Sequence, residues 1–79
     1  MNGVVFNLHD ITAQEFDDFN RAMQEGDVPG QARGLARMVE ACPSEWGDPK
    51  DPQTYLKLKF FDEFKPLRQA FMDEVNGKN

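Results

Sequence analysis

Two side chains in this sequence, His9 and Cys42, are of types that often carry nucleophilic or general-base chemistry, and each is the only one of its kind. A Cys-His or Ser-His-Asp arrangement would rest on His9 alone. A reactive thiol needs a cationic neighbour that lowers its pKa, whereas Glu40 and Glu45 lie near Cys42 in the chain. We therefore predict no catalytic residue and no enzyme activity, and we expect Cys42 to be a small buried side chain near a helix end.

The acidic residues match no known pattern of metal ligands. Paired cysteines and the HxxxH and HExxH spacings are absent. Glu45, Asp48 and Asp51 recur at intervals of three residues, but a calcium loop needs alternating oxygen ligands, a glycine in mid-loop and a closing Glu. Glycine-rich phosphate-binding motifs are also absent from the sequence. The sequence thus predicts neither a metal nor a cofactor.

The formal net charge of −5 argues against nucleic acid as a partner, because an acidic chain repels phosphate backbones. Two helices joined through Gly26–Gly30 have the order of a helix-turn-helix, but that class requires a basic recognition helix. The first residues do not form a signal peptide, and no stretch approaches the roughly 20 apolar residues of a membrane span. With its lone thiol, the chain is expected in the cytoplasm and without a membrane partner.

The spacing of apolar residues predicts a mainly α fold, α+β at most, in a single domain over 1–79. The first helix is expected at 13–25, because Thr12 and Glu15 have the spacing of a capping box. Gly26 follows this segment and is a good terminator in the left-handed conformation. This helix start is the strongest local signal in the sequence.

Two further helices are expected at 31–41 and 62–75. Pro43 is expected to end the first of these, and Pro66 must lie near the first turn of the other, because proline is costly in a helix interior. The last helix carries the densest apolar face of the chain, which consists of Phe60, Phe64, Leu67, Phe71 and Val75. This face predicts the main core helix.

The connecting segments have their own signals. Residues 43–53 hold three prolines and a glycine, which predicts a loop without regular structure. Residues 4–8 and 55–59 have β-branched or alternating apolar residues and could form a short strand pair. The segment 77–79 is expected to be a frayed tail.

Four residues are candidates for contact with another protein: Trp46, Phe61, Arg68 and Met72. Trp46 lies in mid-loop, where it either pins the loop over the core or anchors a partner. Arg68 projects into the apolar arc of the last helix. Its stem can pack there while its head reaches solvent or an acid of the first helix, or it can stand at the rim of an interface. Phe61 and Met72 lie at the edge of the same arc.

The order of elements resembles that of the small tail assembly chaperones of long-tailed bacteriophages and their prophage relatives. The resemblance rests on the short N-terminal strand followed by three segments: Ile11-Thr-Ala-Gln-Glu-Phe-Asp-Asp-Phe-Asn-Arg-Ala22, Gly34-Leu-Ala-Arg-Met-Val39 and Leu58-Lys-Phe-Phe-Asp-Glu-Phe-Lys-Pro-Leu-Arg-Gln-Ala-Phe71. The loop at 43–53 is longer and richer in proline than in that family.

The resemblance implies a cytoplasmic, non-enzymatic factor that coats a tape measure protein before the tail tube polymerises around it. It also implies an apolar groove for helical segments of the client, which we expect between the first and third helices with Phe61, Arg68 and Met72 at its lip. Assembly into a homo-oligomer is left open.

A second hypothesis is an acidic inhibitor or adaptor that occupies a basic site on its partner, as DNA mimics do. It requires that the acids gather on one face: Glu15, Asp17, Asp18, Asp48, Asp51, Asp62 and Asp73.

Overall fold

Four α-helices and a small two-stranded sheet make up the fold in the computed structural model, which describes residues 1–77. The helices are α1 (Ala13–Glu25), α2 (Val28–Met38), α3 (Pro52–Leu56) and α4 (Lys65–Val75), and the strands are β1 (Val5–Phe6) and β2 (Val39–Ala41). A 3₁₀ turn (Ser44–Trp46) precedes α3, and a π-helical turn, η2 (Phe60–Phe64), precedes α4. The mainly α fold expected from the sequence is confirmed.

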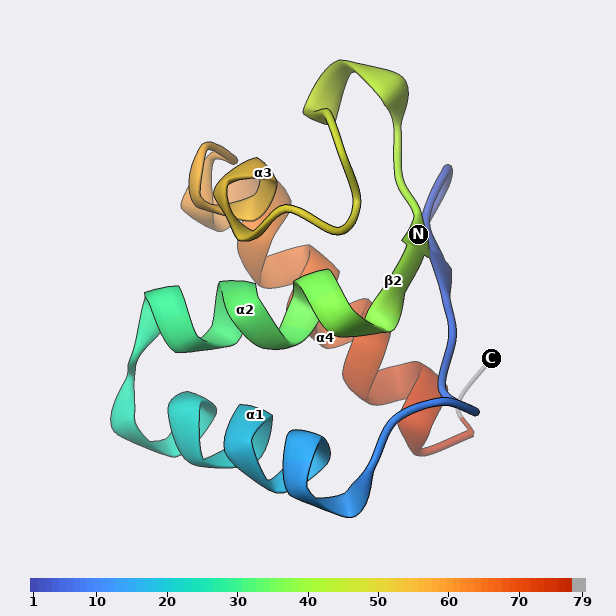
Figure 1. Ribbon diagram of the computed structural model, residues 1–79. Coiled ribbons are helices and arrows are strands. Elements are labelled where there is room, and N and C mark those ends of the chain that lie inside the picture. The colour runs from blue at the N-terminus through green and yellow to red at the C-terminus, as the bar shows by residue number, and fades with distance from the viewer. Residues whose placement is uncertain (78–79) are drawn as a thin grey trace.

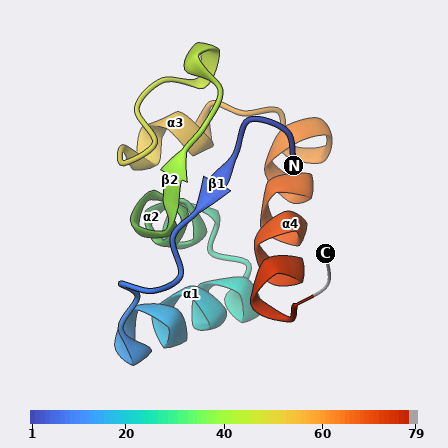
Figure 2. The same ribbon diagram turned by 90° about the vertical axis from the view of Figure 1, so that its right-hand side faces the viewer.

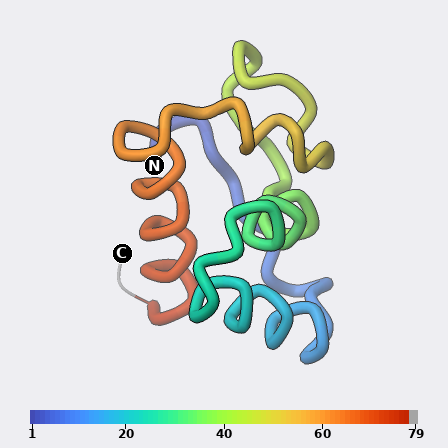
Figure 3. Tube along the Cα trace, turned by 90° about the vertical axis from the view of Figure 1, so that its left-hand side faces the viewer, coloured from blue at the N-terminus to red at the C-terminus, as the bar shows by residue number. Residues whose placement is uncertain are grey.

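The helices are arranged around α2 (Figure 1). α2 lies between α1 on one side and α3 on the other, and α4 crosses behind them. Figure 3 shows the same order from the side, with α1 and the α3 segment at opposite ends of the molecule. The largest fully buried side chains come from every helix, and they include Phe19, Leu35, Tyr55, Phe64 and Phe71.

α1 begins and ends as its sequence predicts. Thr12 is the N-cap, its hydroxyl accepts from the amide of Glu15, and Gly26 at the C-cap has a φ of +67°. α2 starts earlier than expected, at Val28, because Asp27 caps it and accepts a hydrogen bond from the amide of Gly30. Proline at the second helical position fits this start.

The prediction that the second helix continues to residue 41 is wrong. The chain leaves the helix at Val39, where ψ is 120°, and Val39–Ala41 pairs with β1 in an antiparallel sheet. The amide of Asn7 donates to the carbonyl of Met38 at 2.8 Å, so the β1 segment also takes up a carbonyl at the helix end. Val39 is β-branched, and in a continued helix the ring of Pro43 would crowd the carbonyl of Val39, so both residues favour this exit.

The predicted strand at 55–59 is also wrong, since β1 pairs with β2 instead. Asp51 accepts a hydrogen bond from the amide of Gln53, and Pro52 takes the first helical position, so a short helix forms here. Tyr55 is held inside by a 2.6 Å hydrogen bond from its hydroxyl to the carbonyl of Pro49. The supposedly irregular loop 43–53 therefore contains a 3₁₀ turn and the start of α3.

The last helix begins differently from the prediction of 62–75. The π-helical turn comes first, with the amide of Lys65 bonded to the carbonyl of Phe60, and α4 follows. Pro66 lacks an amide proton and its ring crowds the carbonyl four residues earlier, and the wider turn relieves this crowding. Phe64, Leu67 and Phe71 are buried as expected, whereas Phe60, which was expected on the same face, is 39% exposed. Of the predicted frayed tail 77–79, residues 78 and 79 lie outside the described residues.

Candidate protein-binding groove

An apolar hollow of about 250 Å³ lies between the first turn of α1 and the second half of α4. We call it the α1–α4 groove, and the elements around it can be followed in Figure 2. Its lining residues come from the segment after β1, the first turn of α1, the end of α2 and the second half of α4: Leu8, Ile11, Thr12, Ala13, Phe16, Met38, Phe71 and Val75.

The deepest lining residues of the groove belong to the core. Met38 is 1% exposed and Phe71 is fully buried. The ring of Phe71 is fixed by neighbouring rings, with centroid distances of 5.5 Å to Phe6, 6.4 Å to Phe16 and 5.1 Å to Phe19. The pairs with Phe6 and Phe19 are edge to face and the pair with Phe16 is tilted, and aromatic rings prefer such arrangements. The bottom of the groove is therefore set by the packed interior.

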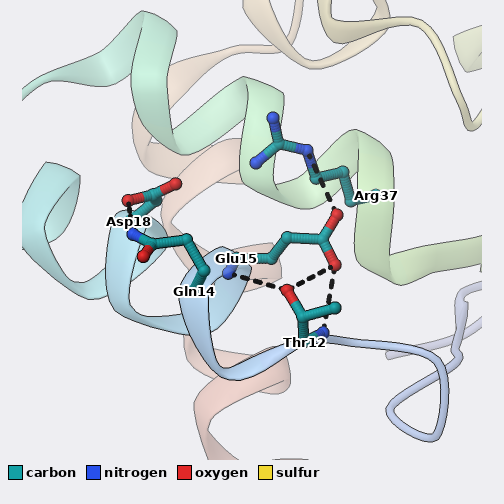
Figure 4. Close-up of polar contacts among 5 residues, drawn as sticks. All are labelled: Thr12, Gln14, Glu15, Asp18 and Arg37. Carbon is teal, nitrogen blue, oxygen red and sulfur yellow. Dashed lines mark hydrogen bonds and ion pairs between the residues drawn. The ribbon is translucent and has the colours of Figure 1, made fainter.

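The rim on α1 is held by the capping box (Figure 4). The amide of Glu15 donates to the Thr12 hydroxyl at 3.1 Å, and the amide of Thr12 donates to Oε1 of Glu15 at 3.0 Å. The other carboxylate oxygen lies 3.7 Å from Nε of Arg37 on α2. The hydrogen bond from the Thr12 amide lowers the pKa of Glu15, with smaller contributions from the Thr12 hydroxyl and from Arg37. These contacts fix the turn that presents Ala13 and Phe16 to the groove.

The chemistry of the groove is that of an apolar contact surface. Among the described residues that line it, Thr12 alone has a polar side chain, and its hydroxyl is already engaged by Glu15. Pockets that bind small substrates combine apolar walls with several converging polar groups. Apart from this hydroxyl the lining is apolar, so the groove suits apolar groups.

The four residues predicted to bind a partner lie outside this groove. The groove is lined by residues of α1 and α4, but Phe61, Arg68 and Met72 are not among its lining residues. Arg68 and Met72 instead share a small hollow of about 60 Å³ with Met23 of α1. Phe61 stands on the π-helical turn and is 75% exposed.

Trp46 is half-buried and packs against the core cluster. It belongs to the 3₁₀ turn at the far end of the molecule from α1 (Figure 1). The structure therefore places Trp46 where it pins its loop, away from the groove.

Arg68 has a partner that the sequence did not reveal. Its guanidinium donates to the side-chain carbonyl of Gln31 on α2 at 2.7 Å, not to an acid of α1. Gln31 is 1% exposed and donates in turn to the carbonyl of Ala22 at 3.1 Å. The spacing of Gln31 with Leu35 and Met38 places it on the inner face of α2, which is the signal that could have found it.

The environments of Cys42 and His9 differ. The thiol of Cys42 donates to the carbonyl of Gly47 at 3.5 Å. Burial raises the pKa of Cys42, and the charge of Asp48 raises it further, so the thiol stays protonated near neutral pH. His9 is exposed. Within residues 1–77, no group of three or more His, Cys, Asp or Glu side chains is placed to hold a metal ion.

Comparisons with known proteins add no relative to this picture. No family model matches the chain, and neither the curated proteins nor the solved structures contain a match. Within residues 1–77, none of the helices is long and apolar enough to cross a membrane.

Proposed function

We propose that this protein is a non-enzymatic binding factor that holds a helical segment of a client protein in the α1–α4 groove. The observation that carries the proposal is the composition of that groove, which is open, apolar and built on a fixed floor of core residues. An amphipathic helix binds such a surface by inserting apolar side chains from one face. The resemblance to tail assembly chaperones makes a tape measure protein the expected client, met in the cytoplasm of a bacterial host.

The distribution of acidic residues supports binding through the apolar groove over binding through an acidic face, as in an acidic inhibitor. Asp17 and Asp18 lie on α1, whereas Asp48 and Asp51 lie in the segment before α3, on the opposite side of α2 (Figure 1). Several acids are also neutralised locally, as in the 2.6 Å ion pair of Asp17 with Arg21. A DNA mimic needs its charges on one continuous face, and these acids come from α1, the segment before α3, the π-helical turn and α4.

Photo-crosslinking from beside the groove tests the proposal. Benzoylphenylalanine is placed at position 9, which is exposed and adjoins the lining residue Leu8 without filling the groove, and at position 24 as a control, which is exposed on α1 but outside the groove. Expressed in its native host, the protein should crosslink from position 9, and not from position 24, to a long helical protein identified by mass spectrometry. Equal crosslinking from both positions, or none from position 9, would refute the groove as the binding site.

Affinity for the purified client then gives a quantitative test. Ala13→Trp fills the groove with an indole and should weaken binding at least tenfold, while the matched variant Gln24→Trp should bind as the wild type does. An Ala13→Trp variant with unchanged affinity would show that the client binds elsewhere.

A further inference from the structure

The π-helical turn carries an exposed aromatic projection, formed by Phe60 and Phe61, which we call the aromatic knob. Phe61 is 75% exposed and Phe60 39% exposed. The two rings are held edge to face at 5.1 Å between centroids, and Phe60 stacks on the buried Phe64 at 5.8 Å. Large apolar side chains grouped on a surface mark sites of interaction, and π-helical turns are frequent at functional sites. The rings of the knob are therefore held in a fixed arrangement that a complementary surface can receive.

The charge around the knob is opposite to that of the rest of the protein. Between Leu56 and Arg68, four basic residues stand against two acidic ones, although the whole chain carries a net charge of −5. Two of the cations lie over knob rings: Lys65 Nζ is 6.0 Å from the centroid of Phe61, and Arg68 Cζ is 5.5 Å from that of Phe60. A surface that is aromatic and basic fits a partner surface that is apolar and acidic.

The α1–α4 groove has these complementary properties. Its lining is apolar, and α1, which forms one of its walls, carries four acidic residues against one basic residue, Arg21. An apolar cavity of roughly 150 Å³ is enough to accept benzene, so the groove volume of about 250 Å³ has room for one phenyl ring. Both halves of a possible contact are thus present on one chain.

The two halves cannot meet within one molecule. The knob precedes the first residue of α4, whereas the groove is lined by Phe71 and Val75 in its second half. Figure 3 shows the π-helical turn and the last turn of α4 at opposite ends of that helix. A knob can therefore reach only the groove of another copy.

We infer that Phe61 of one copy docks in the α1–α4 groove of a second copy, with Lys65 facing the acidic side of α1. Because the two surfaces differ, the contact is heterologous and leaves a free knob at one end and a free groove at the other, so further copies can add or a ring can close. One inserted ring and its surroundings bury less surface than a permanent interface, and the association is weak and reversible. It occupies the groove, and a client must displace it.

Mixing two variants tests the contact directly. Phe61→Asp removes the knob and keeps the groove, and Ala13→Trp blocks the groove and keeps the knob. Both positions are exposed, and circular dichroism should confirm that both variants fold. In sedimentation up to about 1 mM protein, a range suited to weak complexes, the wild type should grow in mass with concentration and each variant should stay monomeric. The equimolar mixture should form a dimer that stops at two copies.

Recovery of a dimer only in the mixture requires that the knob of one variant meet the groove of the other. The inference is overturned if the wild type stays monomeric, as it would if the knob served a different protein, if Phe61→Asp associates like the wild type, or if the mixture remains monomeric. Lys65→Glu is a second, independent test because it leaves the aromatic rings unchanged. This variant should reduce association most at low salt, where charge interactions are least screened. Client binding is read separately, because Phe61→Asp leaves the groove open and should bind client at least as tightly as the wild type.

Discussion

The guanidinium of Arg68 donates a hydrogen bond to the side-chain carbonyl of Gln31 at 2.7 Å and thereby joins α4 to α2. The Arg68 Nε atom is buried and makes no hydrogen bond with the described residues. The rings of Phe60 and Phe64 lie beside the guanidinium, at 5.5 and 5.7 Å from Cζ. Gln31 is thus the hydrogen-bonding partner of a half-buried cation that also lies against two aromatic rings.

Replacing Gln31 by Leu should therefore destabilise the protein by about 2 kcal/mol, because the half-buried guanidinium of Arg68 loses its acceptor. The double variant Gln31→Leu/Arg68→Met removes both polar partners and should recover at least half of that loss. Urea denaturation of the wild type, both single variants and the double variant measures the coupling. A double variant whose loss equals the sum of the two single losses would show that the pair is not coupled.

Gly34 permits the close approach of α2 to α1. A Cβ atom added there would lie 2.5 Å from Cδ1 and 3.2 Å from Cβ of Phe19, a side chain that is 1% exposed. Gly34→Ala should therefore cost about 1–3 kcal/mol through overpacking, even though alanine favours a helix by about 1 kcal/mol. The melting temperature measures the change. The same substitution in a Phe19→Leu background should cost less, and an equal cost in both backgrounds would exclude the steric cause.

Glu15 should contribute to the acid sensitivity of the protein. Its pKa is lowered in the folded state from an ordinary value of 4.5, chiefly by the hydrogen bond from the Thr12 amide. A lowered folded pKa gives stability that is fully present above 4.5 and is lost as the pH falls through the folded value. Glu15→Gln keeps an acceptor for Thr12 but does not titrate, so its unfolding free energy should fall less between neutral pH and pH 3 than that of the wild type. Identical pH profiles would contradict this assignment.

Tyr55 should limit stability at alkaline pH. Burial raises its pKa well above the ordinary value of 10, and the nearby Cys42 and Asp48 add to the shift. The unfolded chain therefore loses the phenolic proton first, and stability falls as the pH rises above 10. Tyr55 is the only tyrosine, so absorbance near 295 nm reports its ionisation directly.

Tyr55→Phe serves as the matched variant for this alkaline loss. It should lose about 1 kcal/mol at neutral pH with the hydrogen bond to Pro49. Its unfolding free energy should also fall less between pH 10 and higher pH than that of the wild type. An ordinary titration midpoint for the folded wild type would place the phenol in solvent and contradict its burial.

The sequence predicted best those features that depend on neighbouring residues. Thr12, Glu15 and Gly26 bound α1 as expected, because caps act within one turn of the chain. Asp51 followed by Pro52 is an equally local signal for the start of α3, whereas the alternating pattern of residues 55–59 favours a strand.

The features that were missed depend on contacts between distant segments. Val39 continues the apolar spacing of α2, and only the presence of β1 as a partner explains why the backbone becomes extended there. The groove could be placed between two helices, but its lining could not, since Leu8, Met38 and Val75 come together only in the folded chain. Among the predicted binding residues, Phe61 and Arg68 belong to the aromatic and basic surface of the π-helical turn, and neither lines the groove.

The short β1 strand has a consequence for motion. It is held by a two-residue ladder to β2, by the amide of Asn7 on the carbonyl of Met38 and by the contact of Phe6 with Phe71. These few bonds can open without disturbing the hydrogen bonds inside any helix. Hydrogen–deuterium exchange should therefore be faster at Phe6 and Asn7 than in the middle of α2. Detachment of this N-terminal arm also carries Leu8 away from the groove, so exchange rates there should slow when the groove is filled.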